Sequence, residues 1–243
     1  MTFLQLCQRA VVECGVSGTI SFVTGQTGSL GRIVNWVAEA WLDIQVEHDD
    51  WDWMRAPLLS SGSVLTGGFA FQTVAGQWSY PIGNGAGTVG IGPTRFGNYD
   101  RWSFRCSTTA QGFLDETQFG EDIPYQAWRD GYMLGANRLL QTRPTVVAIG
   151  SDQSLNLGPP PNGLYTITGD FFVSPTRMVM EPDVPPGLPD RYHMLIVYGA
   201  MRKYAGYEAA SEVMERGTRE YTRMMRHLEV ARLPRMDFAG ALA

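Results

Sequence analysis

The chain contains three histidines, which are far apart in the sequence: His48, His193 and His227. His48 is followed by Asp49, Asp50 and Asp52, and an imidazole among carboxylates can bind a divalent cation. The spacing matches no Ca²⁺-binding loop, and the C-terminus of a helix is an unfavourable place for carboxylates that lack a partner. The sequence therefore predicts no metal site, and we expect these acids to meet arginines of a neighbouring chain.

Four carboxylates in the middle of the chain could form the acid pair of a glycoside hydrolase: Asp115, Glu116, Glu121 and Asp122. Nothing in their spacing distinguishes them from a solvated turn, which is the interpretation we favour. The chain has no G-x-S-x-G motif, and none of its cysteines lies in a nucleophile signature. The sequence therefore predicts no catalytic residue, and we expect a protein that is not an enzyme.

Two glycine-rich segments match nucleotide-binding loops only in part. Residues 25–31 lack the lysine and the spacing of a P-loop. Residues 85–90 match G-x-G-x-x-G, but Ile91-Gly-Pro-Thr follows where a helix should begin. Both segments are expected to be turns, so no cofactor is predicted, and we assign no role to the stretch from Gly83 to Gly97.

Five tryptophans could line a sugar-binding face: Trp51, Trp53, Trp78, Trp102 and Trp128. Packing in a core or an interface is the commoner use of such side chains, because they bury a large area at a small entropic cost. We favour packing, and a carbohydrate-binding module of a tail or receptor protein stays open as an alternative function. The glycoside hydrolase is the second alternative.

Composition excludes several classes of protein. Hydrophobic residues make up 44% of the 243 residues and charged residues 18%, which is typical of a folded globular chain. The net charge of −5 argues against general nucleic-acid binding. We see neither a run of about 18 apolar residues nor a signal peptide, so we expect a protein made in the cytoplasm that does not enter a membrane. Cys7, Cys14 and Cys106 are expected to be buried thiols.

Proline marks the domain organisation, because 13 of the 14 prolines lie between Pro57 and Pro189. The apolar pattern is helical outside that window, and inside it short strands and turns alternate. We therefore predict an α+β fold in which N- and C-terminal helices form a bundle and an antiparallel β domain is inserted between them. The expected parts are residues 1–56, 57–189 and 190–232, with an extended tail over 233–243.

Several helix boundaries can be predicted. Thr2 and Gln5 are spaced as a capping box, and Gly15 is a plausible stop for the first helix. A second helix is expected over residues 29–48. Asp190 is expected to cap the first C-terminal helix, and Gly206 offers a possible break before the second.

The β domain has a more broken pattern. Residues 101–106 alternate as in a half-buried strand, and residues 146–157 indicate a hairpin around Gly150. Another strand is expected over residues 164–171. A short helix is expected over residues 124–134.

The last helix and the tail carry the candidate partner-binding residues. Four arginines lie away from the apolar stripe of the helix and beside few intrahelical acids: Arg216, Arg219, Arg223 and Arg226. The tail has no periodic pattern, yet it is apolar at four positions: Leu233, Met236, Phe238 and Leu242. Unpaired arginines and a free apolar tail both favour binding to another protein.

Three groups of segments together resemble a known family. The first is VNWVAEAWLDIQ at residues 34–45 with HDDWDWMR at 48–55. The second is TRPT at 142–145 with LNLGP at 155–159 and YTITGDFF at 165–172. The third is DVP at 183–185 with LPDRYH at 188–193 and YAGYE at 204–208. In order and spacing, over nearly the whole chain, they resemble the head-to-tail adaptor (connector) proteins of tailed bacteriophages.

The resemblance implies a structural protein of the virion neck. It implies a ring, commonly of twelve copies, bound under the portal protein of the capsid. The helical part and the tail would face the portal, and other surfaces would receive tail or nozzle proteins. DNA would only pass through the channel of the ring. The family offers no catalytic or cofactor-binding residues to carry over.

Overall fold

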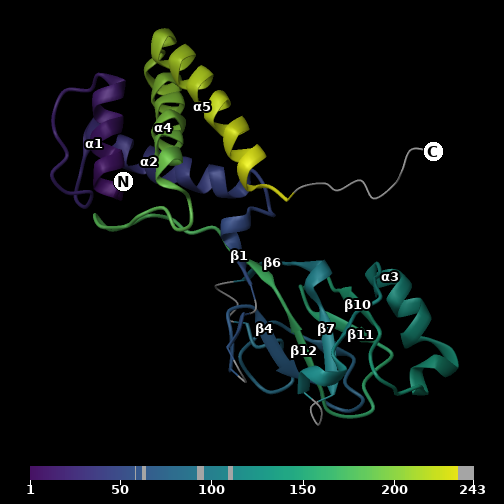
Figure 1. The fold of residues 1–243 in the computed structure, drawn as a ribbon. Helices are drawn as coiled ribbons and strands as arrows, with labels where there is room; N and C mark the ends of the chain where they lie inside the picture. Colours follow the sequence, from purple (N-terminus) through teal and green to yellow (C-terminus); the bar gives the residue numbers. More distant parts are fainter. Residues whose placement is uncertain (58, 62–63, 92–95, 109–111, 235–243) are drawn as a thin grey trace, which may run out of the picture. The chain divides into compact units, whose positions relative to one another are not determined.

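The computed structural model describes residues 1–57, 59–61, 64–91, 96–108 and 112–234. The chain divides into two compact units, of which one comprises residues 1–54 and 175–243 and the other residues 55–174. The sequence analysis expected these boundaries after residues 56 and 189. Helices dominate the first unit and small sheets the second (Figure 1), so the predicted α+β class is confirmed.

The helical unit is organised around one central helix. Its longer helices are α1 (Phe3–Cys14), α2 (Gly28–Val46), α4 (His193–Glu208) and α5 (Ser211–Arg232), and its short 3-10 helices are η1 (Asp52–Met54) and η6 (Asp190–Tyr192). Helix α4 packs against α1, α2 and α5. Its central position explains why so many side chains of α4 are apolar and buried. They include Leu195, Ile196, Val197 and Met201.

Helix α1 begins and ends as predicted. The side chain of Thr2 accepts a hydrogen bond from the Gln5 N–H, and the Gln5 side chain accepts one from the Thr2 N–H. Gly15 ends the helix with φ 67°, a left-handed conformation that glycine adopts without steric cost. Both ends are therefore fixed by local sequence.

Two predictions about α4 are wrong. Asp190 does not cap it, because residues 190–192 form the separate turn η6 after Pro189, and α4 begins at His193. Gly206 does not break it either, since a single glycine costs a helix only about 1 kcal/mol. The helix ends instead at Ala209, which has φ 53° and donates its N–H to the Ala205 carbonyl.

The β unit consists of short strands: β1 (Arg55–Ala56), β2 (Leu59–Ser61), β3 (Val64–Thr66), β4 (Phe69–Gln72), β5 (Ser79–Tyr80), β6 (Phe96–Tyr99), β7 (Arg105–Thr108), β8 (Thr117–Gln118), β9 (Glu121–Asp122), β10 (Val146–Ile149), β11 (Leu155–Gly158), β12 (Tyr165–Gly169) and β13 (Phe171–Val173). In the described part of the chain they form sheets of order β1-β13-β6, β5-β11-β10-β9, β4-β12-β7-β8 and β2-β3. Neighbouring strands are antiparallel, as predicted, except for the parallel pair β9 and β10.

Short helices interrupt these strands: η2 (Arg101–Ser103), η3 (Gly112–Asp115), α3 (Tyr125–Trp128), the π-helix η4 (Arg129–Met133) and η5 (Gly135–Leu139). The hairpin predicted over residues 146–157 is present as β10 and β11. The strand predicted from residue 101 is wrong over its first half, because the Asp100 carboxylate accepts a hydrogen bond from the Trp102 N–H and stabilises η2. Trp102 is consequently 82% exposed.

The core of the β unit is aromatic. Phe69 contacts Phe104 and Tyr99 edge to face, with ring centroids 5.6 and 5.7 Å apart. The glycine-rich stretch contributes to the same core, since Val89 and Ile91 are buried in it. Part of the stretch from Gly83 to Gly97 therefore packs in the core of the β unit. Its residues 92–95 lie outside the described residues.

Candidate functional site

Asp115 and Glu116, two of the four carboxylates considered for hydrolysis, each lie beside an arginine, and the side chains of Glu121 and Asp122 lie outside the described residues. Asp115 accepts a hydrogen bond from the Thr108 N–H at 2.9 Å and lies 3.1 Å from Arg143. Desolvation raises the pKa of Asp115, but the Thr108 hydrogen bonds and the Arg143 charge outweigh it and hold the pKa below its usual range. Glu116 lies 3.7 Å from Arg105. A carboxylate held ionised by an arginine is poorly suited to act as a general acid.

The three histidines stay separate in the fold. The His193 side chain is buried, and its Nε2–H donates to the Leu188 carbonyl at 3.0 Å. His48 lies 3.3 Å from Glu229, and His227 is exposed on α5. Within the described residues, no three His, Cys, Asp or Glu side chains are grouped so as to hold a metal ion.

Four of the five tryptophans pack in two pairs rather than along one face. Trp51 and Trp128 are buried, in the helical and the β unit respectively. Trp53 stacks on Trp51 with centroids 4.3 Å apart, and Trp78 contacts Trp128 edge to face. Trp102 alone of the five is largely exposed, and one ring gives little support for a carbohydrate platform.

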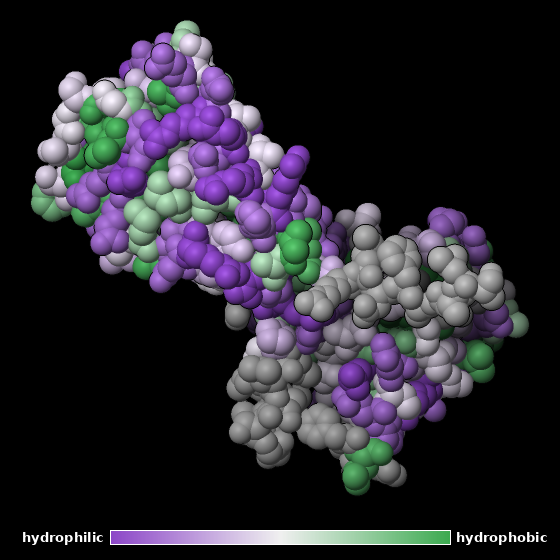
Figure 2. All heavy atoms as spheres, turned by 45° about the horizontal axis from the view of Figure 1, so that its top comes forward, coloured by the Kyte–Doolittle hydropathy of each residue, from purple (hydrophilic) through white to green (hydrophobic). Residues whose placement is uncertain are grey.

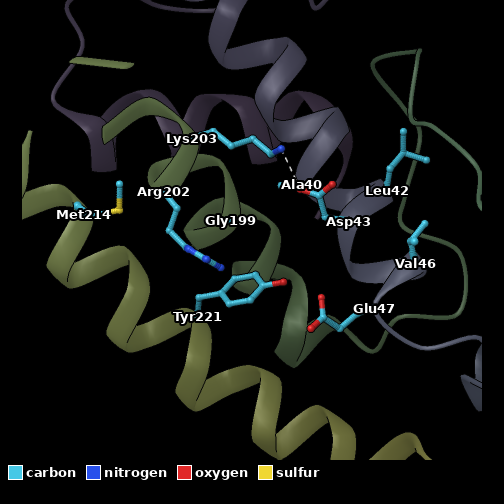
Figure 3. A pocket seen from close by; sticks show the side chains of 10 residues that line it. All are labelled: Ala40, Leu42, Asp43, Val46, Glu47, Gly199, Arg202, Lys203, Met214 and Tyr221. Atoms are coloured by element: carbon cyan, nitrogen blue, oxygen red, sulfur yellow. Dashed lines mark ion pairs between the residues drawn. The ribbon is translucent and has the colours of Figure 1, made fainter. Parts of the chain in front are cut away.

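One concavity of the helical unit lies where α2, α4 and α5 meet. This pocket has a volume of about 690 Å³. Helix α2 contributes Asp43, Val46 and neighbouring Glu47, α4 contributes Arg202 and Lys203, and α5 contributes Tyr221 (Figure 3). Apolar and charged side chains therefore line it together.

One ion-pair cluster lies at the pocket, between Lys203 and two acids of α2. Lys203 Nζ lies 2.9 Å from Asp43 and 3.6 Å from Glu39, and Figure 3 shows the first of these pairs. The Arg202 guanidinium lies over the Tyr221 ring, 4.6 Å from its centroid. Burial, followed by the negative charge of Glu47, raises the pKa of Tyr221 to about 12. Such a pocket suits recognition of a partner side chain better than proton transfer.

The sequence analysis did not identify this pocket. Glu39, Asp43 and Glu47 are spaced by four residues on α2, which places them on one face of that helix. Lys203 is the only lysine of the chain and lies opposite them. The charge spacing could have indicated an ionic contact between the helices, but the facing partner depends on tertiary packing.

The four predicted partner-binding arginines are exposed on α5, but the expectation that they are unpaired is wrong for three of them. Arg216 lies 2.6 Å from Glu13 of α1. Arg223 and Arg219 lie 2.7 and 3.4 Å from Glu220. Arg226 has no ion-pair partner among the residues that the structure describes. Arg216 is paired because the fold brings Glu13 of α1 close to α5. Arg219 and Arg223 are paired because Glu220 lies between them in the sequence.

Of the predicted tail contacts, only Leu233 can be placed. Its N–H donates to the Glu229 carbonyl at 2.9 Å, and its side chain is half-buried. Met236, Phe238 and Leu242 lie outside the described residues.

Figure 2 shows that hydrophilic side chains dominate the face of the helical unit that is turned forward there.

Comparison with known proteins gives one informative result. The family model described as SU10 adaptor protein matches residues 1–241. The search of curated proteins gives no match. In the part of the chain that the structure describes, no helix is both long and apolar enough to cross a membrane.

Proposed function

Because the chain belongs to the SU10 adaptor protein family, we propose that it is a structural adaptor of a bacteriophage virion, joining the portal protein of the capsid to the tail. The observation that carries this proposal is the family match over residues 1–241. The adaptor acts as a ring of identical subunits, commonly twelve, in the neck of the particle, and it has no catalytic role.

The structure supports an assembly role through its surfaces. Burial raises the pKa values of the Cys7, Cys14 and Tyr99 side chains, which pack in the interior. The helical unit instead presents a charged pocket and an arginine-bearing helix. We take this unit to be one bundle into which the β unit is inserted, so that each unit can bind a different neighbour.

We assign the portal contact to the C-terminal tail. The side chains of Met236, Phe238 and Leu242 give this segment an apolar character without a helical period. An apolar segment of this kind gains stability when it docks on a neighbouring protein. We assign the binding of tail or nozzle proteins to the β unit.

The test is binding of the purified portal protein, with electron microscopy of the complex. The full chain should form a ring on the portal, and deletion of residues 234–243 should weaken binding without changing the thermal unfolding of the remainder. Thermal unfolding serves as the control for the fold. Binding that survives the deletion unchanged would contradict the assigned contact, and a full chain that does not bind the portal would contradict the adaptor role.

A further inference from the structure

Three arginines form a continuous basic stripe on the exposed face of α5. Arg219, Arg223 and Arg226 are four and three residues apart, so they lie on one side of the helix. The side chains of Arg219 and Arg223 are 64% and 65% exposed. Glu220, whose side chain is 21% exposed, pairs with both of them, and ion pairs near the surface contribute little stability. The stripe therefore keeps an excess of positive charge available to a partner.

Three acids form an acidic turn where α2 ends. Glu47 follows the last residue of the helix, and Asp49 and Asp50 come after the intervening His48. All three are exposed, and within the described residues none has an ion-pair partner. Negative charge at a helix C-terminus is destabilising, because the helix dipole places a partial negative charge there. A cationic partner would relieve this repulsion.

The two surfaces do not neutralise each other within one subunit. The residues of α5 that face the end of α2 are Glu229, which lies 3.3 Å from His48, and Arg232, which lies 3.0 Å from Asp52. The basic stripe lies on another side of α5 from Gly217, Met225 and Leu228, which are buried. A second copy can supply the contact that the fold of one copy does not make.

We propose that the basic stripe of one copy binds the acidic turn of the next copy. This inference rests on the proposed ring-forming function and names the surfaces that join its subunits. The contact is heterologous, since two different patches meet, and repetition of such a contact closes a ring when the rotation between copies allows it. Each copy brings the three arginines of the stripe and the three acids of the turn to the two patches, so the surfaces that meet are opposite in charge.

A second copy of the chain would provide a partner for both the basic stripe and the acidic turn, whereas other binding partners would pair with only one of them. Nucleic acid would neutralise the stripe, but it would leave the acidic turn unpaired and would be repelled by a chain with a net charge of −5. A portal protein on the stripe would likewise leave the turn without a partner. Charge complementarity within the same sequence therefore favours self-association.

The test uses two charge-reversed proteins and their mixture. The first is Arg219→Glu with Arg223→Glu, and the second is Asp49→Arg with Asp50→Arg. Each alone places like charges at every interface, and assembly should need about a tenfold higher protein concentration. An equimolar mixture should assemble as well as the wild type, because the two variants can alternate around the ring. Sedimentation velocity measures assembly, first without and then with the portal protein.

The control is Arg129→Glu with Arg138→Glu, which makes the same charge change as the first variant at exposed arginines of the β unit. It should assemble like the wild type. Reversed variants that assemble normally alone, a mixture that fails to recover, or a wild type that never self-associates would each overturn the inference. If the mixture fails while the wild type still binds the portal, the adaptor role stands and the stripe faces a different partner.

Discussion

The guanidinium of Arg216 on α5 lies 2.6 Å from the carboxylate of Glu13 on α1. Arg9, one turn before Glu13, lies 2.6 Å from the same carboxylate. The Glu13 side chain is only 7% exposed, whereas both arginines are about half exposed. A shielded carboxylate thus links the first and last helices of the chain.

Replacement of Glu13 by Gln should destabilise the helical unit. Gln keeps the size of the side chain but removes the negative charge to which both arginines donate. Charge-assisted hydrogen bonds are the stronger ones, and we expect a loss of about 1–3 kcal/mol in the free energy of unfolding. Urea denaturation measures it. Glu212→Gln, at an exposed acid of α5, is the matched control and should change stability by less than about 0.5 kcal/mol.

The pair of Arg216 and Glu13 could be predicted from the sequence only in part. The spacing of Arg216, Arg219, Arg223 and Arg226 correctly indicated one exposed face of a helix. It could not show that Arg216 meets Glu13, because that contact joins opposite ends of the chain. The excess charge available to a partner is therefore concentrated at the three later arginines.

Local signals succeeded where no tertiary contact competed with them. The Thr2 and Gln5 capping box and the Gly15 stop involve only neighbouring residues, and the structure shows both. The alternation around Trp102 failed, because a hydrogen bond from its N–H to Asp100 favours a turn over a strand. The pocket was missed for a related reason, since Lys203 and Asp43 meet only when α2 and α4 pack.

Substitution of Gly199 by Ala should separate α2 from α4. A Cβ at this position would lie 2.9 Å from the Cβ of Ala40, closer than packed carbon atoms approach. Overpacking of this kind costs about 1–3 kcal/mol, and it should lower the midpoint of thermal unfolding. An unchanged or higher midpoint would mean that the two helices do not cross this closely.

Gly206→Ala is the matched control on the same helix. Its Cβ would meet only the flexible end of Met214, at 3.8 Å. Alanine is a better helix former than glycine by up to about 1 kcal/mol, so this variant should be more stable than the wild type. A midpoint of thermal unfolding that falls for Gly199→Ala and rises for Gly206→Ala would distinguish the effect of helix packing from that of helix propensity.

The thiols of Cys7 and Cys14 should be unreactive in the folded protein. Burial raises the pKa of each from 9.0 to about 12, and the charge of Glu13 adds to the shift of Cys14. The thiolate is the reactive form, so its fraction near pH 8 falls roughly a thousandfold. Labelling with a thiol-specific disulfide reagent should be slow in buffer and complete in denaturant. Rapid labelling of the native protein would contradict the packing of α1.

His193 should make the protein less stable as the pH falls. Burial lowers the pKa of its imidazole in the folded state, and the Met1 ammonium 2.5 Å away acts in the same direction. The hydrogen bond to Leu188 and the Asp190 carboxylate, 3.6 Å away, oppose the shift without reversing it. Above about pH 6.5 the ring is neutral in both states and contributes no pH dependence. Below that pH the unfolded chain binds the proton first, so stability declines until the folded pKa is passed.

The measurement is the urea midpoint at about pH 7.5, 6.5 and 5.5, compared between the wild type and His193→Gln. The variant should lose about 1–3 kcal/mol at every pH, because the Gln side chain does not fill the space of the buried ring. Its further loss between the highest and the lowest pH should be smaller than that of the wild type. His227→Gln, at an exposed position of α5, should keep the wild-type pH dependence. Equal slopes for all three proteins would show that His193 is protonated as readily in the folded state as in the unfolded chain.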